Sequence, residues 1–147
     1  MIRTIFALLF CSGLFVSCEN NSAKNIEDKG KEKIEKSCDT LMQTFAEGQF
    51  KRAIQSLKQF SVVDNASIDT LTMTAFTQMT NNMNGYGNII SYELVGDKSV
   101  NDFLIQRTYI LRFDNGCMKF VFTLYKGKTG WTVTGFNYDI DISDLFK

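Results

Sequence analysis

The chain has 147 residues, of which 16 are basic and 16 acidic, so it carries no formal net charge. This balance, with no clustered basic stripe, argues against nucleic acid as a partner, because such binding depends on neutralising phosphates. The sequence contains no histidine, which removes the commonest general base and the commonest metal ligand. We therefore predict no catalytic residue, no metal site and no cofactor.

The first eighteen residues, MIRTIFALLFCSGLFVSC, have the order of a bacterial export signal. A basic start precedes an apolar run that is too short to span a bilayer. The last four, Phe-Val-Ser-Cys, resemble the lipobox of bacterial lipoproteins, with a small residue at Ser17 but Phe15 where the pattern usually has leucine. The resemblance implies a signal peptide over 1–17 and diacylation of Cys18. A plain cleaved signal peptide and a short membrane anchor are the alternatives.

We expect the lipid to hold the chain on a bacterial cell-envelope membrane, with its domain facing the periplasm or the exterior. Residues 18–30 are polar and predict a flexible tether after the lipidated cysteine, because they cannot offset the entropy of ordering. Residues 31–147 predict a single domain, since about 130 residues remain after cleavage and these suffice for one core.

Three helical patterns follow the tether. One begins at Lys31, one follows Gly48, and one begins near Ser67, whose hydroxyl is expected to cap the first turn. Each pattern has an apolar face at helical spacing, which predicts the side that packs against the core. These faces comprise Ile34, Cys38, Leu41, Met42 and Phe45; Phe50, Ala53, Ile54, Leu57 and Phe60; and Ile68, Leu71, Ala75, Phe76, Met79 and Met83.

After Gly87 the apolar period changes to two, which predicts strands near residues 89–95, 103–113, 117–125 and 131–140. Asn115-Gly116 predicts a two-residue type I′ turn that sets Asp114 opposite Cys117. Helices followed by a four-stranded antiparallel meander predict an α+β fold, with the helices on one face of a curved sheet.

The predicted register divides the strand side chains between two faces. The face toward the helices is large and aromatic, with Tyr109, Phe113, Phe120, Phe122 and Tyr138. The opposite face is amphiphilic, and we interpret it as an interface, with a solvated sheet face as the alternative. Its apolar members are Ile110, Val121, Tyr125, Trp131 and Val133.

The order of elements resembles small nuclear transport factor 2-like domains of the cystatin-like group over residues 32–142. The segments that carry this resemblance are FAEGQFKRAIQSLK, GYGNIISYEL, the DNG hairpin and LYKGKTGWTVTGFNYD. It implies a cone whose interior can hold a pocket, lined here by the aromatic face just described. Some relatives are isomerases or dehydratases, and others are binding or assembly modules. Relatives that isomerise ketosteroids use a carboxylate base in the cone, and no Asp or Glu falls among the residues predicted to point inward.

We therefore predict a lipid-anchored envelope protein that acts as a non-catalytic binding or interaction module, with the membrane and a second copy or another envelope protein as partners. One alternative is an isomerase-like or dehydratase-like enzyme that uses the cone interior. The other is a structural assembly component that dimerises through the outer sheet face. A carboxylate beside Tyr109 or Tyr138 in a polar cavity would favour the enzyme, and a cone filled by phenylalanine would favour the module.

Two further patterns in the sequence are weaker. Asp139, Asp141 and Asp144 lack the glycine and the distal glutamate of a calcium loop, so a solvated strand end explains them better. Cys38 and Cys117 fall on different sides of the predicted sheet, which disfavours a disulfide between them.

Overall fold

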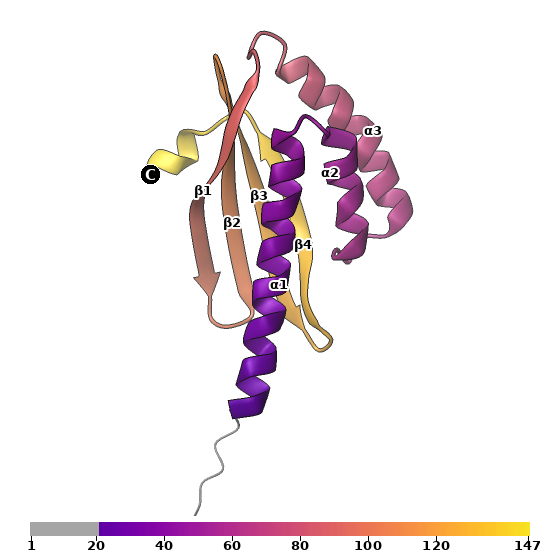
Figure 1. The fold of residues 1–147 in the computed structure, drawn as a ribbon, viewed down its shortest axis with the longest axis vertical. Coiled ribbons are helices and arrows are strands. Elements are labelled where there is room, and N and C mark those ends of the chain that lie inside the picture. Colours follow the sequence, from indigo (N-terminus) through magenta and orange to yellow (C-terminus); the bar gives the residue numbers. More distant parts are fainter. Residues whose placement is uncertain (1–20) are drawn as a thin grey trace, which may run out of the picture.

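A computed structural model describes the backbone of residues 21–147, and the side chains of residues 29–147 apart from Asn82. Three α-helices pack with a four-stranded antiparallel open sheet, and two short 3-10 turns complete the fold (Figure 1). The helices lie on one face of the sheet. The predicted α+β class and strand order are confirmed. The predicted signal peptide and Cys18 lie outside the described residues.

Helix α1 (Asn21–Ala46) begins before the expected start at Lys31, so residues 21–30 of the predicted tether are helical. Its contact with the sheet extends beyond the predicted start, because a Cβ placed on Gly30 would lie 3.7 Å from Trp131 Cδ1. The predicted apolar face of this helix is confirmed, since its five members, from Ile34 to Phe45, are all buried.

Helix α2 (Phe50–Ser56) continues into the 3-10 turn η1 (Leu57–Gln59), and α3 (Asn65–Asn82) packs against α2. The prediction that Ser67 caps α3 is wrong. Asp64 is the N-cap residue, and its two carboxylate oxygens accept hydrogen bonds from the Ser67 amide at 2.9 Å and hydroxyl at 2.6 Å. The aspartate satisfies a free amide of the first turn, with Ser67 as the donor.

The strands β1 (Ile89–Val100), β2 (Leu104–Phe113), β3 (Cys117–Gly127) and β4 (Gly130–Asp139) pair in chain order. Strand β1 extends further than predicted. Gly127 pairs with Gly130 across a two-residue loop.

The predicted type I′ turn at Asn115-Gly116 is wrong, because neither residue has a positive φ and Arg112, not Asp114, lies opposite Cys117. Hydrogen bonds to the segment that precedes β1 determine the shape of this loop. Asp114 Oδ2 accepts a hydrogen bond from the Asn88 amide, and the Asn115 amide donates to the carbonyl of Tyr86, both at 2.8 Å. The register of this hairpin moves by two residues, so the side chains of β2 and β3 keep the faces that the sequence predicts.

The prediction of the outer face is wrong at two residues of β4, because this strand contains a β-bulge. Thr123 pairs with Gly135, but Leu124 pairs with Val133, so Thr134 is an extra residue. Trp131 and Val133 therefore lie on the helix side of the sheet, where Val133 is buried and Trp131 packs against the core. Ile110, Val121 and Tyr125 remain on the outer sheet face, the side away from the helices.

Candidate functional site

The interior that the sequence predicts as a pocket is filled by aromatic rings. Tyr109, Phe120 and Phe122 are fully buried, and Phe113 is nearly so. Ring centroids lie 4.8 Å apart for Phe45 and Phe120, and 5.6 Å apart for Tyr109 and Phe122. The aromatic side chains of the sheet and of α1 thus pack against one another in tilted and edge-on arrangements, as in an ordinary packed core.

Tyr138, the fifth predicted lining residue, lies at the rim of this core and is partly buried. Its hydroxyl donates a hydrogen bond of 2.6 Å to Gln78 Oε1 on α3, and burial raises the pKa of the phenol. No carboxylate contacts this hydroxyl in the hydrogen bonds of the described residues. Tyr138 therefore ties β4 to α3.

Several clefts lie on the surface of the helical layer, and those described here are not lined by Tyr109, Phe120 or Phe122. A cleft of about 420 Å³ runs between α1 and α2, and carries the basic residues Lys33, Lys36 and Arg52. A smaller one of about 290 Å³ lies between α3 and β4. The four buried members of the predicted lining thus belong to the core, whereas Tyr138 borders a further cleft of about 400 Å³ beside Lys119 and Val121.

A polar cluster beneath α1 was missed by sequence reasoning. The Tyr109 hydroxyl donates a hydrogen bond of 2.5 Å to Asp39 Oδ1 on α1. No Asp or Glu falls among the strand residues predicted to point inward, but a helix supplies a carboxylate beside Tyr109. Asp39 comes from a helix flank rather than a strand, which is why the strand pattern did not reveal it.

Arg107 is the charged centre of this cluster and is only 6% exposed. Its nitrogens lie 3.5 Å from Asp39 Oδ1, 3.8 Å from Glu35 Oε2 and 3.8 Å from Asp97 Oδ2. Its Nε has no hydrogen-bond partner among the residues that the structure describes. A buried guanidinium requires counter-charges, and α1 and β1 supply three carboxylates here. The sequence held a signal for this cluster, because Arg107 shares the inward parity of Tyr109.

The surroundings of Tyr109 and Cys38 determine their protonation states. Burial raises the pKa of Tyr109 far above its usual range, and the hydrogen bond to Asp39 raises it further, against the opposing effect of Arg107. Burial likewise raises the pKa of the adjacent Cys38 thiol to about 12. Both groups stay protonated at neutral pH. Since Tyr109 has one hydroxyl proton and donates it to Asp39, it has none left to polarise a carbonyl.

The outer sheet face divides into a covered part and an open part. Lys119 is 8% exposed because the C-terminal segment crosses over it, and its Nζ lies 2.5 Å from Asp144 Oδ1 of the 3-10 turn η2 (Ser143–Phe146). The open part presents Tyr125, which is 43% exposed and packs edge-on against Phe103 at 6.3 Å.

The three C-terminal aspartates act separately rather than converging. Asp139 accepts a hydrogen bond from the Asp141 amide, Asp141 accepts one from the Ser143 amide, and Asp144 pairs with Lys119. They stabilise the turns of the C-terminal segment.

Both cysteines of the described region, Cys38 and Cys117, are free thiols, and they lie on opposite sides of the sheet as predicted. No helix within residues 21–147 is long and apolar enough to cross a bilayer. Comparisons of the chain with protein-family models, with curated proteins and with solved structures each gave no match.

Proposed function

We propose that this chain is a lipid-anchored protein of a bacterial cell envelope, facing the periplasm or the exterior, and that it works as a non-catalytic binding or interaction module. The observation that supports a non-catalytic binding or interaction module is the filled interior. Phe45, Phe120 and Phe122 occupy the space in which an enzyme with a nuclear transport factor 2-like cone would hold its substrate. The order of three helices and a four-stranded meander supports the proposed relationship to that group.

The polar cluster beneath α1 supports the same proposal. Its hydroxyl proton is donated within the protein, and its guanidinium is surrounded by the protein's own carboxylates. Such a cluster positions α1 on the sheet, whereas a catalytic site needs at least one donor or base directed at a substrate.

The binding surface in this proposal is the open part of the outer sheet face, around Tyr125. Ile110 and Val121 lie on the same face with partly buried side chains, and exposed aromatic residues of this kind are enriched at protein interfaces. The structural alternative, an assembly component that dimerises through this face, would use the same residues.

Photocrosslinking of the full-length protein in its own membrane tests this surface. A photoreactive amino acid at Tyr125 should give an adduct of discrete mass, and the mass distinguishes a second copy from another envelope protein. Met73 on α3 is 61% exposed and lies on the helical layer, so the same substitution there is the matched control. Adducts that are absent at both positions, or equal at both, would contradict the proposal.

One observation favours the enzyme as a second candidate, namely the carboxylate of Asp39 beside Tyr109. An isomerase-like site would bind small ketones through the Tyr109 hydroxyl. A titration of wild type and Tyr109→Phe with a panel of cyclic ketones, followed by thermal stability, separates the two. Stabilisation that is lost in Tyr109→Phe would support the enzyme, and no shift in either protein supports the module.

A further inference from the structure

The two outer edges of the sheet differ in whether their backbone groups are paired. The outer edge of β4 is covered around Val133, because the Val133 amide donates to the Phe60 carbonyl at 2.9 Å and the Val62 amide donates to the Val133 carbonyl at 3.2 Å. Strand β1 has 12 residues and pairs with β2 alone among residues 21–147, so its other edge is open (Figure 1). An open edge presents backbone donors and acceptors to another strand.

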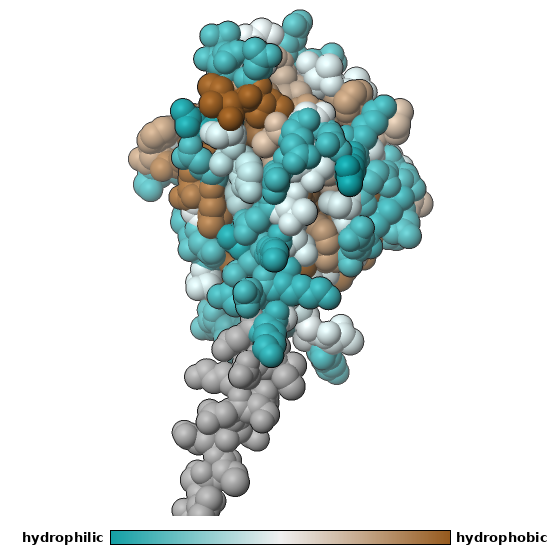
Figure 2. All heavy atoms as spheres, viewed as in Figure 1, coloured by the Kyte–Doolittle hydropathy of each residue, from teal (hydrophilic) through white to brown (hydrophobic). Residues whose placement is uncertain are grey.

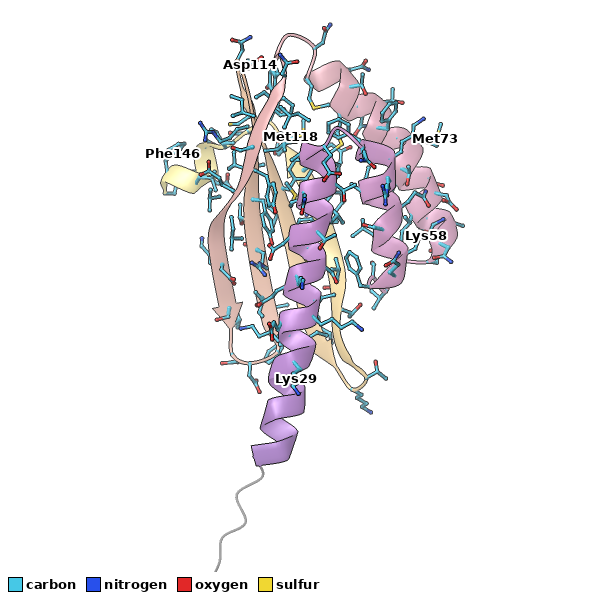
Figure 3. The ribbon with its side chains drawn as sticks, viewed as in Figure 1. Lys29, Lys58, Met73, Asp114, Met118 and Phe146 are labelled. Atoms are coloured by element: carbon cyan, nitrogen blue, oxygen red, sulfur yellow. The ribbon has the colours of Figure 1, made fainter. Side chains whose placement is uncertain are left out.

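Apolar side chains gather at this open edge. Ile90, Leu94 and Val95 are 56%, 43% and 48% exposed. Hydrophobic residues are visible on the β1 side of the molecule in Figure 2, and Figure 3 labels Phe146 of the C-terminal turn on the same side of the view. Phe146 is 81% exposed. Apolar surface that continues along an open strand edge is a feature of association sites.

A β-bulge gives this edge a particular charge pattern. Leu94 pairs with Tyr109 and Gly96 pairs with Thr108, so Val95 is an extra residue. Consequently Glu93 and Lys98 both lie on the outer face, although residues five positions apart would lie on opposite faces of a regular strand.

We propose that two copies of this chain pair antiparallel through β1, with Glu93 of each copy opposite Lys98 of the other. The two-fold symmetry repeats the ion pair, and the two four-stranded sheets become continuous. Arg112 Nη1 lies 2.7 Å from Glu93 Oε1 and holds this carboxylate on the outer face, while Lys98 has no ion pair within the described residues.

The register is specified by charge and by face. A shift of one residue would set Glu93 opposite Asp97, which brings like charges together. It would also pair an outward residue with an inward one, because Asp97 lies opposite Arg107 on the helix side. This inference goes beyond the proposed function, since it assigns a different surface and a defined partner, and it does not depend on the lipid anchor.

Disulfide crosslinking of the full-length protein in membranes tests the register directly. In a Cys117→Ser background, the double variant Glu93→Cys/Lys98→Cys should form a disulfide-linked dimer under mild oxidation. Either single variant is the matched control, because in this register its two cysteines lie about 14 Å apart along the strands, four strand steps once the extra residue Val95 is left out. The absence of a dimer in the double variant, equal crosslinking in a single variant, or a crosslink only to another protein would overturn the proposal.

Charge exchange provides a second test that needs no crosslink. Sedimentation equilibrium in density-matched detergent should give a dimer for the wild type, a loss of dimer for Lys98→Glu and its recovery for Glu93→Lys/Lys98→Glu. Both side chains are exposed, and circular dichroism checks that each variant is folded. A monomeric wild type, or equal association in all three proteins, would also overturn the proposal.

Discussion

The Tyr109 hydroxyl donates a hydrogen bond of 2.5 Å to Asp39 Oδ1, although the two residues are 70 positions apart in the chain. The bond joins β2 to α1 beside the buried Arg107. It makes Tyr109 part of the contact that holds the helix on the sheet, and this role differs from that of an oxyanion donor in an enzyme.

Tyr109→Phe should therefore lower the free energy of unfolding by about 1 kcal/mol, because one hydrogen bond to a charged acceptor is lost while Asp39 can still reach water. Urea denaturation measures the change. Tyr125→Phe is the control and should have almost no effect, because the Tyr125 hydroxyl makes no hydrogen bond within residues 29–147. Equal effects of the two substitutions would contradict the assigned role.

Phe122→Ala should destabilise the protein by about 3 to 5 kcal/mol, because it removes a fully buried ring from a packed core. Val121→Ala, on the outer sheet face of the same strand, should cost much less. Chemical denaturation of both variants measures the two losses in the free energy of unfolding. A small effect of Phe122→Ala would indicate that the interior is not filled as described.

Substitutions at Gly85 and Gly87 should separate the effect of backbone strain from that of a steric clash with Asp114. Gly85 and Gly87 both have positive φ, of 94° and 82°, but only a Cβ on Gly87 would meet Asp114, at 2.7 Å from Oδ2. Gly87→Ala should thus destabilise the protein more than Gly85→Ala, since it adds a steric conflict to the backbone strain. Thermal melts of the two variants give the comparison, and an equal loss would show that the contact with Asp114 is unimportant.

Alkaline pH should destabilise the fold through Cys38. Its thiol has an ordinary pKa of 9.0, and burial raises the pKa to about 12 in the folded protein. The unfolded chain therefore loses its proton first, so stability is fully present below pH 9 and is lost as pH rises toward 12. The slope for one such group is at most about 1.4 kcal/mol per pH unit.

Cys38→Ala should remove the part of the decline that begins near pH 9. It should leave the later decline from Tyr109, whose raised pKa acts in the same direction above pH 10. Unfolding free energies of both proteins across this range test the effect. Identical slopes for wild type and Cys38→Ala between pH 9 and 10 would disprove it.

The sequence predicted the features that depend on local periodicity. The apolar faces of α1 and α2 and the inward parity of Tyr109, Phe120 and Phe122 all follow from spacing alone, and the structure confirms them. These predictions succeed because burial of a whole face dominates the energy of each element.

The errors arise where distant segments decide the local structure. The Asn115-Gly116 loop is shaped by hydrogen bonds to Tyr86 and Asn88, which turn propensity does not include. The extra residue Thr134 reverses the faces of Trp131 and Val133, and no local pattern identified it. Asp39 reaches Tyr109 only once α1 has docked on the sheet.

The central claim is the lipid anchor at Cys18, and the intact mass and membrane partition of the protein produced in a bacterium test it most directly, beside Cys18→Ala. The account predicts that the wild type begins at Cys18, carries acyl mass and partitions with the membrane, and that Cys18→Ala carries none. Cleavage at another position without lipid would contradict it, and would leave a free secreted protein in place of an envelope-anchored module.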